Sequence, residues 1–131
     1  MEEKNINYLH EVNNLNLILR FLLETVAFIS PAFYIASITS SYLSIILPIL
    51  TTLTLAAIWG IFAVPNDPSR SGKTVVKTPG WIRLILEQCI FTFGAYCIWQ
   101  LGYETTAWVF LGVVVVHNLM FWERNAWLVR Q

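Results

Sequence analysis

One apolar stretch runs from Leu15 to Thr39 and reads LNLILRFLLETVAFISPAFYIASIT. A helix needs roughly 20 mostly apolar residues to cross the hydrocarbon core of a bilayer, so this stretch is long enough to do so. Its charged residues, Arg20 and Glu24, are four positions apart, so they share one face of a helix and can pair. The stretch therefore predicts a membrane-spanning helix with an ion pair in its interior.

Three more apolar segments follow, at about 43–64, 81–101 and 105–122. Backbone groups in lipid must be hydrogen-bonded internally, and segments of this length favour helices over barrel strands. The chain is 56% hydrophobic and 12% charged over 131 residues, more apolar surface than a soluble protein of this size needs. We therefore expect an all-α membrane protein, a four-transmembrane-helix bundle over 15–129 with a polar loop at 66–80.

A polar N-terminal tail at 1–14 precedes the first apolar segment. Ile6, Leu9 and Val12 are spaced by three, as in a short helix that lies on the membrane surface. The stretch is also short and contains few good helix formers, which is typical of a disordered segment. Both alternatives stay open for this tail.

The cationic residues predict how the chain is oriented. Outside the apolar segments, the cations lie in the two tails and the central loop, and they are Lys4, Arg70, Lys73, Lys77, Arg124 and Arg130. The short turns at 40–42 and 102–104 contain no Lys or Arg. Loops rich in Lys and Arg remain on the cytoplasmic side of a membrane. Both termini and the central loop are therefore expected in the cytoplasm.

Matching residues recur along the chain with a shift of 63 positions (83 − 20). The pairs are Arg20 and Arg83, Glu24 and Glu87, and Trp59 and Trp122. Two hairpins of two crossings each would have the same orientation, related by an axis along the membrane normal. The recurrence predicts such a parallel internal repeat.

A candidate polar site follows from the depth of the charged groups. Four uncompensated charges inside the membrane would cost about 10–14 kcal/mol, so they should face one another across adjacent first and third helices. We expect Arg20 to reach Glu87 and Arg83 to reach Glu24. The returning fourth helix brings a histidine to the same depth, where it could hydrogen-bond a carboxylate. The predicted layer comprises Arg20, Glu24, Arg83, Glu87, His117 and Asn118.

Two functions of this layer remain open. The layer could be a buried salt-bridge network in a structural or accessory membrane subunit. It could instead be a proton, ion or polar-solute site in a small transporter or channel that acts as a homodimer. The balance of two cations against two anions favours the structural interpretation, because conduction paths usually show an excess of one sign.

Several other classes of function have no support in the sequence. A formal net charge of zero gives no reason to expect a nucleic-acid partner. The stretch from Ser71 to Thr74 resembles the end of a phosphate-binding loop, but Asp67 stands where that loop needs glycine, so no nucleotide is expected. Cys89 and Cys97 lack metal-ligand spacing. No catalytic arrangement, metal or cofactor is expected, and the lipid bilayer is the expected partner.

These motifs together resemble the YrdB-like family of small bacterial membrane proteins. The resemblance is carried by Asn16-Leu17-x-Leu19-Arg20-Phe21-Leu22-Leu23-Glu24, by Trp59-Gly60-x-Phe62-x-x-Pro65, and by Arg83-Leu84-x-Leu86-Glu87-x-x-x-Phe91. It implies a four-helix fold in a bacterial cytoplasmic (inner) membrane, and it implies no particular activity.

Overall fold

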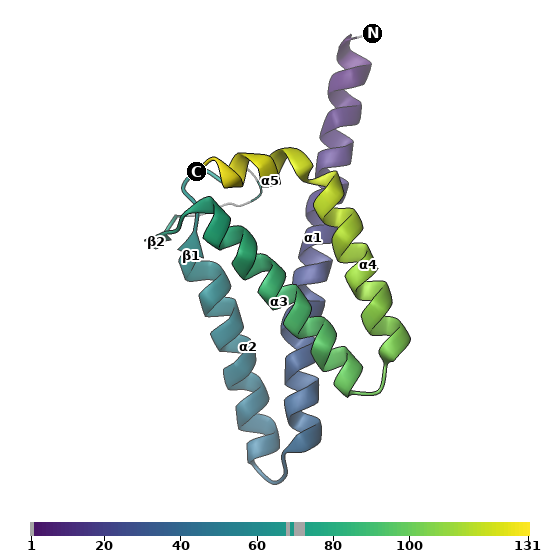
Figure 1. The fold of residues 1–131 in the computed structure, drawn as a ribbon, viewed down its shortest axis with the longest axis vertical. Coiled ribbons are helices and arrows are strands. Elements are labelled where there is room, and N and C mark those ends of the chain that lie inside the picture. The colour runs from purple at the N-terminus through teal and green to yellow at the C-terminus, as the bar shows by residue number, and fades with distance from the viewer. Residues whose placement is uncertain (1, 68, 70–72) are drawn as a thin grey trace.

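The computed structural model describes residues 2–67, 69 and 73–131, and for residues 2–13 it describes the backbone alone. The chain is mostly helical (Figure 1). Its elements are α1 (Glu2–Ile38), α2 (Leu43–Ile61), β1 (Phe62–Ala63), β2 (Val76–Lys77), α3 (Gly80–Gln100), α4 (Glu104–Met120) and α5 (Trp122–Val129). Arg70, Ser71 and Gly72, which belong to the predicted cationic loop and to the stretch like a phosphate-binding loop, lie outside the described residues.

Three helices are long and apolar enough to cross a membrane. They are the Asn14–Ile38 part of α1, α2 and α3. Helix α4 meets the same test only when it is counted together with α5, from which it is separated by a bend of 74°. The described residues therefore contain three candidate spans, or four if the bent pair forms one.

The predicted helices differ from the observed ones mainly at the ends that lie opposite the two short turns. Helix α1 continues through the predicted tail to Glu2. Helix α2 stops at Ile61 rather than at residue 64, because Phe62 and Ala63 pair in parallel with Val76 and Lys77. The last predicted segment does not continue straight to Trp122. It bends at Phe121, whose backbone leaves helical geometry (φ −95°, ψ 23°), and the more polar sequence that follows forms α5.

Both short turns lie at one end of the molecule, and the loop and α5 lie at the other (Figure 1). Helix α5 crosses that second end, from which the first part of α1 projects. The close packing of α5 on the start of α3 depends on Gly80, since a Cβ on this residue would stand 1.8 Å from the carbonyl oxygen of Leu128. Glycine at the start of α3 therefore leaves room for the C-terminal end of α5.

The apolar core lies between α1, α3 and α4. Its buried members are Leu23, Ala27, Ile90, Phe91, Ala95, Ile98, Ala107, Phe110 and Val114. Helices α1 and α3 approach closely at Gly94, where a Cβ would lie 2.8 Å from the Cα of Ala27. Nearby, the Ser30 hydroxyl donates to the Gly94 carbonyl oxygen at 3.1 Å.

Helix α2 is the most peripheral of the long helices, with no fully buried residue. It joins the core through Trp59, whose ring meets Phe28 edge-on at 5.9 Å and Phe91 at 6.2 Å between centroids. Many other apolar side chains of α2 are exposed, among them Ile45, Ile49 and Leu53, as lipid-facing side chains are. The outer surface thus has the character of a membrane protein.

Candidate functional site

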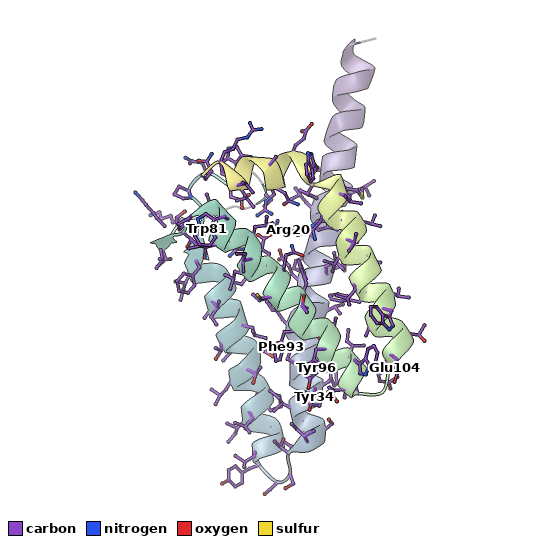
Figure 2. All side chains as sticks on the ribbon, viewed as in Figure 1. Arg20, Tyr34, Trp81, Phe93, Tyr96 and Glu104 are labelled. Carbon is purple, nitrogen blue, oxygen red and sulfur yellow. The ribbon has the colours of Figure 1, made fainter. Side chains whose placement is uncertain are left out.

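A cluster of six charged side chains occupies the end of the bundle beneath α5. Figure 2 shows Arg20 there, close to where α1 and α3 approach α5. The members come from α1, α3, α5 and the loop after β1, and we call them the ion cluster: Arg20, Glu24, Asp67, Arg83, Glu87 and Arg124. Three arginines balance three carboxylates, so the cluster is formally neutral.

Glu87 is the centre of the ion cluster. Its side chain is 3% exposed, and its Oε1 accepts from Arg20 Nη2 at 2.8 Å and from Arg83 Nε at 3.1 Å. Arg124 reaches the same carboxylate through Nη2 to Oε1 at 2.8 Å and through Nη1 to Oε2 at 2.9 Å. One carboxylate from α3 therefore joins arginines of α1, α3 and α5.

Arg124 connects the helices to the loop after β1. Its Nη2 donates to Asp67 Oδ2 at 2.6 Å, and its Nε donates to Asp67 Oδ1 at 3.1 Å. Ser69 also donates to Asp67 Oδ1, through its backbone N–H at 2.9 Å and its hydroxyl at 2.8 Å. Burial alone would raise the pKa of Asp67, but the hydrogen bonds and charge of Arg124, helped by Ser69, lower it to about 2.

Arg83 ties α3 to the end of α2. Its Nη1 donates to the carbonyl oxygen of Trp59 at 2.7 Å and to that of Phe62. These carbonyls lie where α2 ends, and the last carbonyls of a helix have no N–H partner within it. The guanidinium carbon also lies 4.1 Å from the centroid of the Trp59 ring, a cation–π contact that Arg20 shares at 5.4 Å.

The expected reciprocal pairing is half present. Arg20 bonds both Glu24, at 2.7 Å from its Nε, and Glu87. No hydrogen bond joins Arg83 to Glu24 in the described structure, because Arg83 is engaged by Glu87 and the α2 carbonyls. Glu24 is consequently the outer member of the cluster, with 18% of its side chain exposed against 3% for Glu87.

The two α4 residues of the predicted layer take separate positions. His117 is 3% exposed and packs on Phe121 with 4.7 Å between ring centroids, but its Nδ1 has no hydrogen-bond partner in the described structure. Among the described residues, no hydrogen bond joins either ring nitrogen of His117 to a carboxylate, so the expected bond is not formed. Asn118 instead exchanges hydrogen bonds with Gln88 at 3.1 and 3.2 Å, apart from the charges.

Sequence reasoning missed Asp67 and Arg124 as partners. Asp67 stood out only as a mismatch to a phosphate-binding loop, and Arg124 only as a cytoplasmic cation. A sequence signal existed, since WERNAWLV places Arg124 and Leu128 four apart on one helix face, and both are buried. The bend that turns this face toward Glu87 could not be located from the pattern.

A pocket of about 330 Å³ opens beside the cluster, between α1 and the α4–α5 bend. Arg124 is the member of the ion cluster that lines it, and Glu87 does not. Among the described residues, no group of three or more His, Cys, Asp or Glu side chains could hold a metal ion. The geometry is that of a paired and largely buried charge network with a polar pocket at its edge.

The comparisons with known proteins agree with one another. Residues 18–115 match the family model described as "Protein of unknown function (DUF2568)". The chain is 34% identical over 123 residues to "Uncharacterized protein YrdB" of Bacillus subtilis (strain 168), covering 94% of this chain and 100% of that protein. No solved structure matches the chain. The match over most of the length, including both Arg–Glu motifs, means that this chain belongs to the YrdB-like DUF2568 family.

Proposed function

We propose that the protein is a structural or accessory subunit of the bacterial cytoplasmic membrane, where it crosses the bilayer four times. In this proposal α4 is the fourth span and α5 lies at the inner surface. The two short turns lie opposite the loop and α5, as an even number of crossings requires (Figure 1). The positive charges of the tails and loop support a cytoplasmic location for both termini.

The observation that carries the structural role is the complete pairing of the ion cluster. Its three arginines each bond a carboxylate, and Glu87 alone joins three elements. A conduction or exchange site needs a group that is free to bind and release an ion, whereas here each carboxylate already accepts from at least one guanidinium. The network holds α1, α2, α3, α5 and the loop in a single arrangement.

The energetics fit a structural role. Removing one partner of a buried ion pair costs about 3–5 kcal/mol, because the remaining charge stays buried without compensation. Glu87 compensates parts of three arginines, so its charge is the one whose loss leaves the greatest imbalance. We expect lipid to be the main partner and no catalytic activity.

The test is the double substitution Glu24→Gln with Glu87→Gln, studied in detergent and in liposomes. We expect the double variant to lose thermal stability or fail to fold, and the parent protein to show no proton flux above that of empty liposomes. Glu104→Gln, at an exposed carboxylate at the start of α4, is the matched control and should behave like the parent.

Transport is the second candidate, and one observation favours it. The polar pocket reaches Arg124, which directly bonds Glu87, so the Glu87 carboxylate lies one side chain away from open space. A parent protein that conducts protons, together with a double variant that folds normally but conducts none, would replace the structural proposal with the transport one.

A further inference from the structure

The pocket at the α4–α5 bend combines polar and apolar walls. Asn16 contributes from α1, Phe121 from the bend, and Glu123, Arg124 and Trp127 from α5. The pocket encloses about 330 Å³. It lies outside the ion cluster except for Arg124, whose guanidinium is engaged by Asp67 and Glu87.

Asn16 is the unexplained feature of this pocket. The residue is only 6% exposed, and its side-chain oxygen has no hydrogen-bond partner among the described residues. A buried polar atom without a partner costs about 1–3 kcal/mol, and native proteins rarely leave one unpaired. An oxygen of this kind accepts hydrogen bonds, so the missing group is a donor.

The protein does not supply that donor from the neighbouring cations. Arg124 directs its Nε, Nη1 and Nη2 at Asp67 and Glu87 over 2.6–3.1 Å. Arg20, one turn along α1 from Asn16, directs its Nε and Nη2 at Glu24 and Glu87. Because Asn16 also lines the pocket, a molecule that enters the pocket can supply the donor once the buried amide oxygen turns toward it.

The rest of the lining favours a cationic donor. Glu123 adds an exposed carboxylate that pairs with no cation of the ion cluster, and Trp127 adds an indole ring. A carboxylate, a ring face and an amide oxygen are together the groups that recognise an ammonium ion. Leu17, Met120 and Phe121 provide an apolar side that suits a molecule with hydrocarbon attached.

We propose that this pocket, lined by Asn16, Glu123 and Trp127, binds the primary ammonium group of a phospholipid headgroup or of a small free amine. The lipid source rests on the proposed position of α5 at the membrane surface. The chemistry of recognition is the same for both sources, and they differ in whether acyl chains are needed for binding.

The experiment titrates the full-length, detergent-solubilised protein and follows its unfolding temperature. Three probes are compared: short-chain phosphatidylethanolamine, short-chain phosphatidylglycerol and ethanolamine. A ligand that binds only the folded state raises the unfolding temperature in proportion to its concentration over Kd. We expect phosphatidylethanolamine to raise it more than phosphatidylglycerol. If ethanolamine raises the unfolding temperature as much as phosphatidylethanolamine does, the site binds free amines. If phosphatidylethanolamine raises it and ethanolamine does not, the site binds the lipid.

Two variants test the residues. Glu123→Gln, at an exposed position, should weaken phosphatidylethanolamine binding about tenfold, as expected for the loss of one charge-assisted contact. Asn16→Leu should weaken binding similarly, and without ligand it should unfold no earlier than the parent because it removes an unpaired buried polar group. Glu104→Gln, an exposed carboxylate on α4 outside the pocket, should leave binding unchanged.

Equal stabilisation by phosphatidylglycerol and phosphatidylethanolamine would overturn the proposal, and so would parental affinity in Glu123→Gln. If Asn16→Leu does not fold, Glu123→Gln alone decides. Because these titrations use solubilised protein, a negative result leaves the four crossings and the structural role of the ion cluster intact. The proton flux measured in liposomes tests the structural role, and cysteine labelling in intact cells, described below, tests the four crossings.

Discussion

At the scale of single residues, the two Arg–Glu motifs are alike in sequence and unlike in structure. Both place arginine four positions before glutamate, and both form the expected pair within a helix. The further partners could not be predicted in this way. Asp67 and Arg124 are 57 positions apart, and Arg124 is 37 positions from Glu87, and no periodicity links residues so distant. Glu87 is therefore the buried centre of the cluster, bonded by three arginines, and Glu24 lies at its edge, bonded by one.

Asp67 makes stability depend on pH. Its pKa is about 2 when folded against an ordinary value of 3.8, so the folded state favours the ionised carboxylate. This contribution is present in full above pH 3.8 and is lost as the pH falls through about 2. The size of the shift corresponds to about 2 kcal/mol.

We therefore predict that the parent protein loses about 2 kcal/mol more stability than Asp67→Asn between pH 5 and pH 2. Chemical unfolding in detergent at a series of pH values measures the difference. Parallel curves for the two proteins would show that Asp67 does not stabilise the fold through its charge.

At the scale of elements, hydropathy located the long helices but not their ends. A helix that crosses lipid must have a minimum apolar length, so most of the ends of α1, α2 and α3 could be predicted to within a few residues. The ends of α2 and α4 depend on other forces. Helix α2 stops where β1 pairs with β2, and α4 bends where the buried face of α5 is drawn to Glu87 and α3.

The contact of α1 with α3 gives a prediction at this scale. Gly94→Ala should destabilise the protein by about 1–3 kcal/mol, because the new Cβ would lie 2.8 Å from the Cα of Ala27, a backbone atom that cannot easily move. Gly112→Ala in α4 is the matched control. No atom lies within 4 Å of its Cβ, so it should be neutral or stabilising by up to about 1 kcal/mol. Unfolding of both variants in detergent provides the comparison, and equal effects would mean that α1 and α3 do not meet at Gly94.

At the scale of the whole molecule, the apolar composition and the length of the apolar segments predicted a helical protein suited to a lipid environment. Many outward-facing side chains of the helices are apolar, and Arg20, Glu24, Arg83 and Glu87 gather within one cluster. The internal repeat with its 63-residue shift stays a prediction, and its matched residues have different surroundings. Arg20 and Arg83 meet on one carboxylate, whereas Trp59 packs between helices and Trp122 is 68% exposed. The difference arises because Trp59 precedes β1 and Trp122 follows the bend at Phe121.

The proposed four crossings predict a labelling pattern. In a Cys89→Ala, Cys97→Ala background, cysteine at Ser40 or Tyr103 should react with a membrane-impermeant maleimide added to intact bacterial cells. Cysteine at Lys77 or Gln131 should react only after the membrane is opened. Labelling of Gln131→Cys in intact cells would mean that the C-terminus is outside and that the number of crossings is odd or the orientation reversed.

The most direct test of the ion cluster as a structural device compares two single substitutions of the same kind. Glu24→Gln and Glu87→Gln each remove one carboxylate charge four residues after an arginine, but only Glu87 is bonded by three arginines. The measurement is the free energy of unfolding of each variant in detergent. We predict a loss of about 3–5 kcal/mol for Glu87→Gln and a clearly smaller loss for Glu24→Gln. A Glu87→Gln protein as stable as the parent would contradict a structural role for the cluster, and equal losses in the two variants would contradict the central position of Glu87 within it.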